Sequence, residues 1–175
     1  MRALKFWKTV ARDDVNFLDD LIALLTENRI RYCVIGGQGV NAYVEPLVSL
    51  DLDLVIAVDQ IDQARDILGN NFPLEEFEHS INISVPGSDL RVQIQTDPRY
   101  FEFVNRAEPR DVLGLRMPVA RLDDVLAGKV WAATDPSRRP SKRRKDVLDI
   151  ERILEAAPHL RGGVPRELIR RISEI

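Results

Sequence analysis

Residues 32–58 read YCVIGGQGVNAYVEPLVSLDLDLVIAV, and this stretch decides how the rest of the chain can fold. Its first four residues are apolar and predict a short strand that ends on Gly36 and Gly37. Residues 39–44 are compatible with a brief helix, which Pro46 must end. Residues 49–56 begin with alternating polar and apolar side chains and predict a second strand. The stretch is therefore a strand, a glycine turn, a short helix and a strand.

Two aspartates mark the second strand as a candidate binding site. Side chains alternate across a strand, so Asp51 and Asp53 share one face while the neighbouring leucines take the other. Two carboxylates this close repel each other unless a divalent cation or a cationic ligand neutralises them, or unless the end of the strand faces water. The glycines that precede them offer free backbone amides to a phosphate. Together these features indicate a site for a metal and a phosphate.

Length and composition describe an ordinary globular protein. The 175 residues are enough for one domain with a hydrophobic core, and 45% of them are hydrophobic and 30% charged. The formal net charge is −3, so the molecule as a whole does not attract nucleic acid or anionic membranes. The charge is uneven, however. Residues 138–145 contain no acid and six cations, which are Arg138, Arg139, Lys142, Arg143, Arg144 and Lys145.

Several classes of protein are excluded by what the chain lacks. Cys33 is the single cysteine, so no disulfide shapes the fold and a cytoplasmic location is expected. His79 and His159 are the two histidines and lie far apart in the sequence, which leaves no usual zinc constellation. No apolar run approaches the roughly 18 residues of a membrane span, so no membrane association is expected.

The remaining pattern predicts an α+β protein, that is, a mixed-sheet α/β domain flanked by helices. Helical periodicity covers residues 14–28, 59–68 and 122–133, and further helices begin near residues 141 and 165. Residues 77–85 and 90–96 alternate and predict a β-hairpin, a loop region with Pro98 and Pro109 follows, and residues 114–119 form a short apolar segment. We expect residues 1–120 to form the core, and residues 121–175 to form a helical part packed on it within one compact domain.

Residues 37–42 also match G-x-G-x-x-A, the phosphate-binding signature of dinucleotide-binding folds. Asp59 lies about where such a fold places an acid against a ribose. Pro46, however, limits the following helix to about two turns, which is too short for a helix that crosses over a sheet. The signature also leaves Asp51 and Asp53 unexplained. A dinucleotide-binding protein is therefore the less favoured interpretation.

A different family accounts for more of these residues. The glycine pair at 36–37, followed by Asp-Leu-Asp-Leu at 51–54, resembles the small-residue pair and the acid-hydrophobic-acid motif of the polymerase-beta-like nucleotidyltransferase superfamily. The resemblance covers about residues 14–154 and is strongest to small bacterial nucleotidyltransferase-like proteins, including abortive-infection toxins and minimal nucleotidyltransferases. It implies that Asp51 and Asp53 hold Mg²⁺, which bridges to a nucleoside triphosphate. The residues expected to line the nucleotide site are Gly36, Gly37, Gln38 and Ser49.

The same resemblance implies a third carboxylate on a neighbouring strand, and here the chain departs from the family. The expected position is Gln93, in the alternating segment at residues 89–95. A glutamine offers a carbonyl oxygen, but neither a negative charge nor a proton acceptor of carboxylate strength. Two interpretations therefore remain open. The protein is either a nucleotidyltransferase that acts on a hydroxyl of RNA or of a partner protein, or a catalytically silent nucleotide- or RNA-binding module, for example half of a toxin–antitoxin pair.

Cations in the last third of the chain are candidates for binding phosphate. The C-terminal helices of the family carry a lysine and a basic-Asp pair, so Lys129 and Lys145 are expected to contact the triphosphate. The alternative for Lys129 is a half-buried lysine whose ammonium group reaches solvent. Four cations at the start of a helix oppose the helix dipole. Residues 138–145 are therefore either solvated surface or a binding site for a nucleotide tail, RNA or a cognate protein.

Overall fold

The helices and strands follow the order that the sequence predicts, with additions described below. The computed structural model describes residues 12–174, so residues 1–11 of the predicted core lie outside the described part. The strands are β1 (Tyr32–Ile35), β2 (Asp51–Ile56), β3 (Leu74–Phe77), β4 (Ser80–Ile83), β5 (Arg91–Gln95), β6 (Glu108–Val112) and β7 (Leu115–Val119). The α-helices are α2 (Arg12–Glu27), α3 (Gly36–Asn41), α4 (Ile61–Asn71), α5 (Phe103–Arg106), α6 (Leu122–Thr134), α7 (Pro140–Ala156) and α8 (Arg166–Ser173). The 3-10 segments are η1 (Val58–Gln60), η2 (Pro98–Tyr100) and η3 (Pro158–Gly163).

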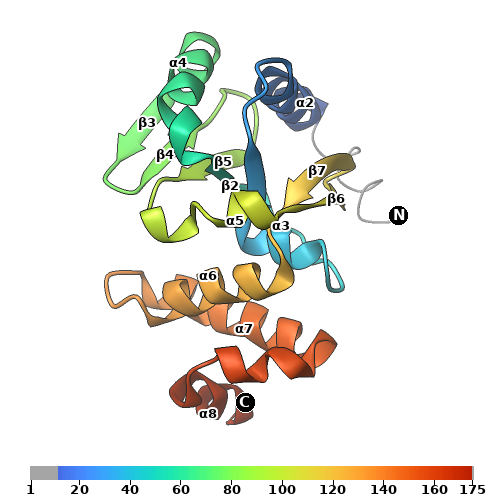
Figure 1. Cartoon of the computed structure of the whole chain (residues 1–175), viewed down its shortest axis with the longest axis vertical. Helices are drawn as coiled ribbons and strands as arrows, with labels where there is room; N and C mark the ends of the chain where they lie inside the picture. The colour runs from blue at the N-terminus through green and yellow to red at the C-terminus, as the bar shows by residue number, and fades with distance from the viewer. Residues whose placement is uncertain (1–11, 175) are drawn as a thin grey trace.

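One mixed sheet of seven strands holds these elements together, in the order β3-β4-β5-β2-β1-β7-β6 (Figure 1). The pairs β2–β5 and β1–β7 are parallel, and the other neighbours are antiparallel. The predicted α+β, mixed-sheet fold is confirmed. None of the helices in residues 12–174 is long and apolar enough to span a bilayer.

The alternation of side chains along β2 separates two hydrophobic cores. Leu52, Leu54 and Ile56 are fully buried on one face, where α2 and α4 pack. Val55 is fully buried on the opposite face, in the core that α3, α5, α6 and α7 complete. Figure 1 shows the two groups of helices on opposite sides of the sheet, with α6, α7 and α8 together at the C-terminal side. Asp51 and Asp53 lie on the same face of β2 as Val55, which is the face that α6 and α7 cover.

The strand predicted at residues 77–85 is shorter in the structure, where β4 covers residues 80–83, and an additional strand, β3, precedes it at residues 74–77. A turn at Glu78 and His79 ends β3, and only β4 forms the predicted hairpin with β5, in the register Ser80↔Gln95. The strand β3 lies at the edge of the sheet, and its Glu75 and Glu76 are exposed. Because no residue of β3 is buried on either face, the strand lacks the apolar alternation by which a strand is recognised, and its sequence resembles a loop.

The loop predicted around Pro109 is also wrong in part, because β6 pairs with β7 as a second edge hairpin. Proline is tolerated in an edge strand, where no neighbour needs its missing N–H. The two strands are joined by Leu113 and Gly114, which both have positive φ, 50° and 88°. This backbone is typical of tight hairpin turns, but a leucine rarely adopts it, so a turn is not recognisable at this position from the sequence.

The dinucleotide-binding interpretation is excluded by the pairing of the first two strands. β1 and β2 are antiparallel, whereas a dinucleotide-binding fold requires parallel strands linked by a crossover helix. The intervening helix α3 has six residues and begins at Gly36, three residues before the predicted start. Asp59, the candidate ribose-binding acid, instead pairs with Arg31 at 2.6 Å.

Candidate active site

The sheet brings the predicted acids and Gln93 together on one face. In the parallel register of β2 and β5, Asp51 lies opposite Arg91 and Asp53 lies opposite Gln93. Neighbouring strands are about 4.8 Å apart, so Gln93 is beside Asp53, as expected of the third position of the site. On the far side of Gln93, the hairpin register places Asn82 of β4. Across the three neighbouring strands β2, β5 and β4, the carboxylate of Asp53 is thus followed by the amides of Gln93 and Asn82.

Asp53 is the acid held closest to the glycine pair. Gly36 has φ +64°, and a Cβ added to it would overlap Oδ2 of Asp53, so only glycine fits at this position. Within residues 12–174 the Asp53 carboxylate makes no hydrogen bond or ion pair. Burial raises the pKa of Asp53, the charge of Lys129 opposes this rise, and the charge of Asp51 adds to it. Asp53 is therefore a carboxylate that lacks a direct counter-ion.

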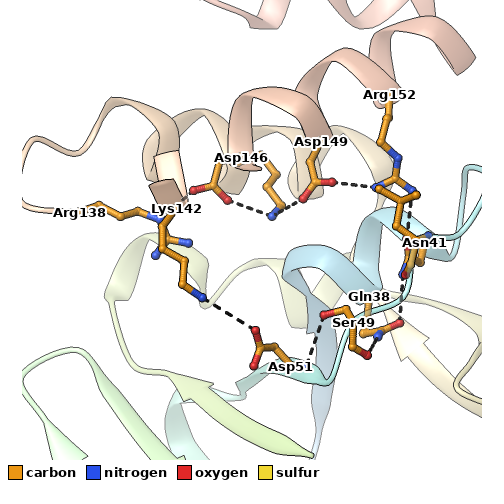
Figure 2. A network of polar contacts seen from close by, with 11 residues as sticks. Gln38, Asn41, Ser49, Asp51, Arg138, Lys142, Asp146, Asp149 and Arg152 are labelled. Carbon is orange, nitrogen blue, oxygen red and sulfur yellow. Dashed lines mark hydrogen bonds and ion pairs between the residues drawn. The ribbon is translucent and has the colours of Figure 1, made fainter. Parts of the chain in front are cut away.

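Asp51 differs from Asp53 because cations already contact it. Nε of Arg91 lies 2.8 Å from Oδ1. Nζ of Lys142, at the start of α7, lies 4.0 Å from Oδ2 (Figure 2). The backbone N–H of Asp51 donates to Oγ of Ser49 at 3.3 Å. A cation from a neighbouring strand and one from a distant helix thus meet at the first acid of the motif.

A cavity of about 400 Å³ opens between this face of the sheet and the first turns of α7. It is lined by most of the residues that the sequence singled out, namely Gly37, Ser49, Asp51, Asp53, Gln93, Lys129 and Lys145. A smaller cavity of about 90 Å³ shares Asp53, Gln93 and Lys129 with it and adds Gly36. Residues to which sequence reasoning gave no individual role also line the larger cavity, and they include Asn82, Arg91, Arg138, Lys142 and Asp146.

The alternative given for Lys129, a half-buried lysine whose ammonium group reaches solvent, is wrong, while its contact with a triphosphate stays a prediction. Lys129 is 7% exposed and forms a buried ion-pair cluster, with Nζ 3.0 Å from Oδ1 of Asp146 and 2.7 Å from Oδ2 of Asp149. Burial alone would lower the pKa of Lys129, but the charges and hydrogen bonds of the two aspartates outweigh it and raise the pKa. Its ammonium group is therefore held between α6 and α7 and does not extend into solvent, although the side chain still borders both cavities.

The basic run divides between structural and exposed positions. Nε of Arg138 lies 2.7 Å from Oδ2 of Asp146 and completes the buried cluster. Lys142 and Lys145 lie in the first turns of α7 and line the cavity. Arg139 and Arg144 are exposed. The helix thus carries positive charge at its N-terminal end, where its dipole is also positive, directly beside the acids of β2.

Gln38 supports the loop before β2 and does not line the cavity. It is 4% exposed, and its amide donates to the carbonyl oxygen of Ser49 at 3.0 Å. On the other side of the loop, Arg152 of α7 pairs with Asp149 and donates to Oδ1 of Asn41 at 3.0 Å (Figure 2). The network in Figure 2 therefore connects α7 to the segment that carries Ser49 and Asp51.

The donor set suits one magnesium ion better than two. Mg²⁺ is commonly held by one or two carboxylates together with substrate phosphates, and Asp51 and Asp53 meet that requirement. In the described part of the chain, however, no group of three or more acidic, histidine or cysteine side chains is placed to hold a metal. Gln93 and Asn82 stand where further acids would have to be, so a second ion would lack a charged ligand.

Comparison with known protein families gives a match over most of the chain. A family model described as "Nucleotidyl transferase AbiEii toxin, Type IV TA system" matches residues 48–173, which is more than half of the chain and contains both acids and α7. No curated protein sequence matches the chain significantly.

Several solved structures have a similar fold. The antibiotic-resistance factor ANT(2'')-Ia has a TM-score of 0.60 at 11% sequence identity, over 93% of this chain and 90% of that one. The lincosamide antibiotic adenylyltransferase LnuA has a TM-score of 0.53 at 12% identity, over 82% and 98% of the two chains. An antigenic nucleotidyltransferase-like protein from Paracoccidioides brasiliensis has a TM-score of 0.53 at 16% identity, over 83% and 77%. At these identities the likeness concerns the fold alone.

Proposed function

The chain belongs to the AbiEii family of nucleotidyl transferase toxins of type IV toxin–antitoxin systems, and from this we propose that it binds a nucleoside triphosphate with Mg²⁺ and transfers the nucleotidyl group to a hydroxyl. The acceptor that we propose is RNA or a partner protein. The dominant support is the single cavity that joins Asp51 and Asp53 to Gly37, Lys142 and Lys145. The carboxylates that could hold a metal and the cations that could bind phosphates line this same cavity.

Each part of the cavity has a distinct task in this proposal. Asp51 and Asp53 would hold Mg²⁺, which when bound neutralises charge on the phosphates and on the leaving pyrophosphate. Lys142 and Lys145 would bind phosphate oxygens from the α7 side. Gly37 has room around it, since an added Cβ would meet no atom nearer than Oγ of Ser49 at 4.0 Å, so its backbone amide can approach a phosphate closely.

The transfer itself would exchange the phosphoanhydride bond between the α- and β-phosphates for a phosphodiester bond to the acceptor. The acceptor oxygen would attack the α-phosphorus, the bond from that phosphorus to the pyrophosphate oxygen would break, and the acceptor proton must pass to a base. A carboxylate at the position of Gln93 would serve as that base, but glutamine cannot accept the proton. The proton would therefore leave to solvent water, which predicts slow turnover.

The proposed acceptors follow from the charge at the start of α7. Arg139 and Arg144 are exposed beside the cavity-lining lysines, which together make a surface that attracts a polyanion. RNA is the acceptor that this surface favours, and a cognate protein with an acidic patch is the other.

A catalytically silent binding module is the second candidate, and Gln93 is the observation that favours it. Such a module would bind the triphosphate with one metal ion without reacting. The two candidates predict the same ligand and differ only in whether a product is formed.

Two measurements on the full chain test the proposal. Calorimetric titration with ATP, GTP, CTP and UTP, each with and without Mg²⁺, should show binding of at least one triphosphate that is tighter with the metal. Mass spectrometry of RNA and of partner proteins after incubation should then show an added nucleotidyl mass. Binding without any addition supports the silent module, whereas the absence of metal-dependent binding to all four triphosphates contradicts both candidates.

Replacing Gln93 with aspartate should raise any transfer activity at least about tenfold, because a positioned general base contributes typically 10²–10⁴-fold. The variant should also bind Mn²⁺ more tightly, and without metal it should melt at a lower temperature than the wild type, because a third carboxylate is added beside Asp53. The measurements are the rate of product formation and the melting temperature with and without Mn²⁺.

Gln93→Asn is the matched control for this variant, since it shortens the side chain equally without adding charge. It should show neither the gain in rate nor the metal-dependent gain in melting temperature. Equal behaviour of the two variants would mean that position 93 does not complete the metal site.

A further inference from the structure

Arg91 is the cation that contacts the metal-binding acids most closely, and the proposed function gives it no role. Its Nε lies 2.8 Å from Oδ1 of Asp51, and the strand register holds the two residues directly opposite each other. The Arg91 side chain is 69% exposed, so it is free to turn away, while the Asp51 side chain is only 30% exposed. Arg91 also lines the larger cavity.

The ion pair places Arg91 in competition with a divalent cation. A metal at Asp51 requires the same carboxylate oxygens, and two positive charges within a few ångströms repel each other. Asp53 offers no alternative partner for the guanidinium, because its carboxylate lies deeper, against Gly36. A metal that binds on its own must therefore displace Arg91 and leave that charge beside it.

A bound triphosphate would change this balance. The guanidinium group matches phosphate geometry with two parallel N–H donors, and its exposed side chain can reach into the cavity that it lines. Once Arg91 contacts a phosphate oxygen, Asp51 is free for the metal and the repulsion is screened by the phosphate. Metal and triphosphate would then favour each other's binding, and this coupling must be reciprocal.

We propose that Arg91 is an exchangeable counter-ion, which neutralises Asp51 in the nucleotide-free protein and moves to a phosphate of the incoming triphosphate as the metal takes its place. The proposal rests on the proposed function and adds a regulation to the same site. The protein would hold the metal weakly until a triphosphate arrives. Lys142, 4.0 Å from the other oxygen of Asp51, would assist Arg91 from the side of α7.

Arg91→Met tests this with two ligands measured separately. Binding of Mn²⁺ alone is followed by electron paramagnetic resonance, and binding of metal-free inorganic tripolyphosphate is followed by calorimetry. The Kd for Mn²⁺ should fall about three- to tenfold, because the metal no longer has to break an exposed ion pair and is no longer repelled by the guanidinium group. The Kd for tripolyphosphate should rise about three- to tenfold, since a charge-assisted hydrogen bond is lost. Opposite changes in one variant are the signature of an exchange.

Two control variants separate the exchange from a general effect of charge. Lys145→Met removes a cation from the same cavity that does not pair with Asp51, so it should weaken tripolyphosphate binding while changing the Kd for Mn²⁺ less than twofold. Arg116→Met removes an arginine of similar exposure, 66%, from a surface ion pair with Asp111 on β6 and should change neither constant. Tightening of Mn²⁺ in Lys145→Met equal to that in Arg91→Met would overturn the proposal.

The outcomes also distinguish the failure of this proposal from the failure of the proposed function. If the wild type binds a nucleoside triphosphate with Mn²⁺ and Arg91→Met leaves the affinity for Mn²⁺ alone unchanged, Arg91 is not an exchangeable counter-ion although the function stands. If the wild type binds neither Mn²⁺ nor any triphosphate, the proposed function fails and the role of Arg91 fails with it.

Discussion

Replacing Asp51 and Asp53 together with asparagine is expected to abolish Mg²⁺-dependent triphosphate binding and to leave the fold intact. The loss of affinity should exceed about 100-fold, because even residues in the outer shell of a metal site contribute 10–100-fold. Asparagine keeps the size of each side chain, and both positions are only partly buried, so no cavity is created. Calorimetric titration with a triphosphate, with and without Mg²⁺, measures the loss.

The same variant should be more stable than the metal-free wild type at neutral pH. The folded-state pKa of Asp53 is raised, so the folded protein binds that proton more tightly than the unfolded chain does. The wild type therefore loses stability as the pH rises from the ordinary aspartate pKa, about 3.9, through the raised value. The advantage of the variant should be absent below that window and constant above it, which melting temperatures across the pH range can show.

Asp59→Asn with Asp62→Asn is the matched control, because it removes the same two charges at exposed positions beyond the opposite end of β2. It should bind triphosphate like the wild type. If the Asp51 and Asp53 variant instead unfolds, and Mg²⁺ does not raise the melting temperature of the wild type, the two acids are structural and the proposed metal site is wrong.

Replacing Lys129 with methionine is expected to cause the largest loss of stability of any single change at this site. It would leave Asp146 and Asp149, each about 2% exposed, without the ammonium group between them. Removing one partner of a buried ion pair costs about 3–5 kcal/mol, and we expect the lower end because Arg138 and Arg152 each keep one aspartate partnered. Unfolding in urea, followed by circular dichroism, measures the change in the free energy of unfolding.

A second substitution tests whether the loss of stability comes from the two buried aspartates. Asp149→Asn in the Lys129→Met background should recover part of the stability, since it removes the Oδ2 oxygen that Lys129 contacted, while the remaining amide oxygen can still accept from Arg152. Lys145→Met, which removes an exposed lysine of α7, should lose little stability. If Lys129→Met is as stable as the wild type and loses only triphosphate affinity, the lysine is a phosphate contact and not a structural residue.

Much of the fold could be read from periodicity within short segments. The alternation around Asp51 and Asp53 is a property of consecutive residues in one strand, and so is the helical spacing of α4, α6 and α7. The prediction was wrong where local signals are weak, at the edge strands β3 and β6 and at the positive-φ turn of Leu113. Most residues of β3 and β6 are exposed or half-buried on both faces, so their side chains do not alternate between apolar and polar.

The candidate site depended on both sources of information. The sequence by itself determined that two acids share one face, that a glycine pair precedes them, and that six cations lie just before and at the start of a late helix. It also singled out Gln93 as the residue at the third position, and the register of β2 with β5 places Gln93 opposite Asp53.

Only the tertiary structure decided what those residues contact. Arg91 forms an ion pair with Asp51 because β5 lies beside β2, although the two residues are some 40 positions apart in the sequence. Lys142 contacts the same acid from α7. In the sequence, Lys129 lies among the apolar residues of a helix, which does not reveal its partners. Its burial between Asp146 and Asp149 follows from how α6 packs on α7. Periodicity along one segment determines on which face of a strand or helix a side chain lies. The residue that the side chain contacts belongs to another segment, and strand order and helix packing determine which residue that is.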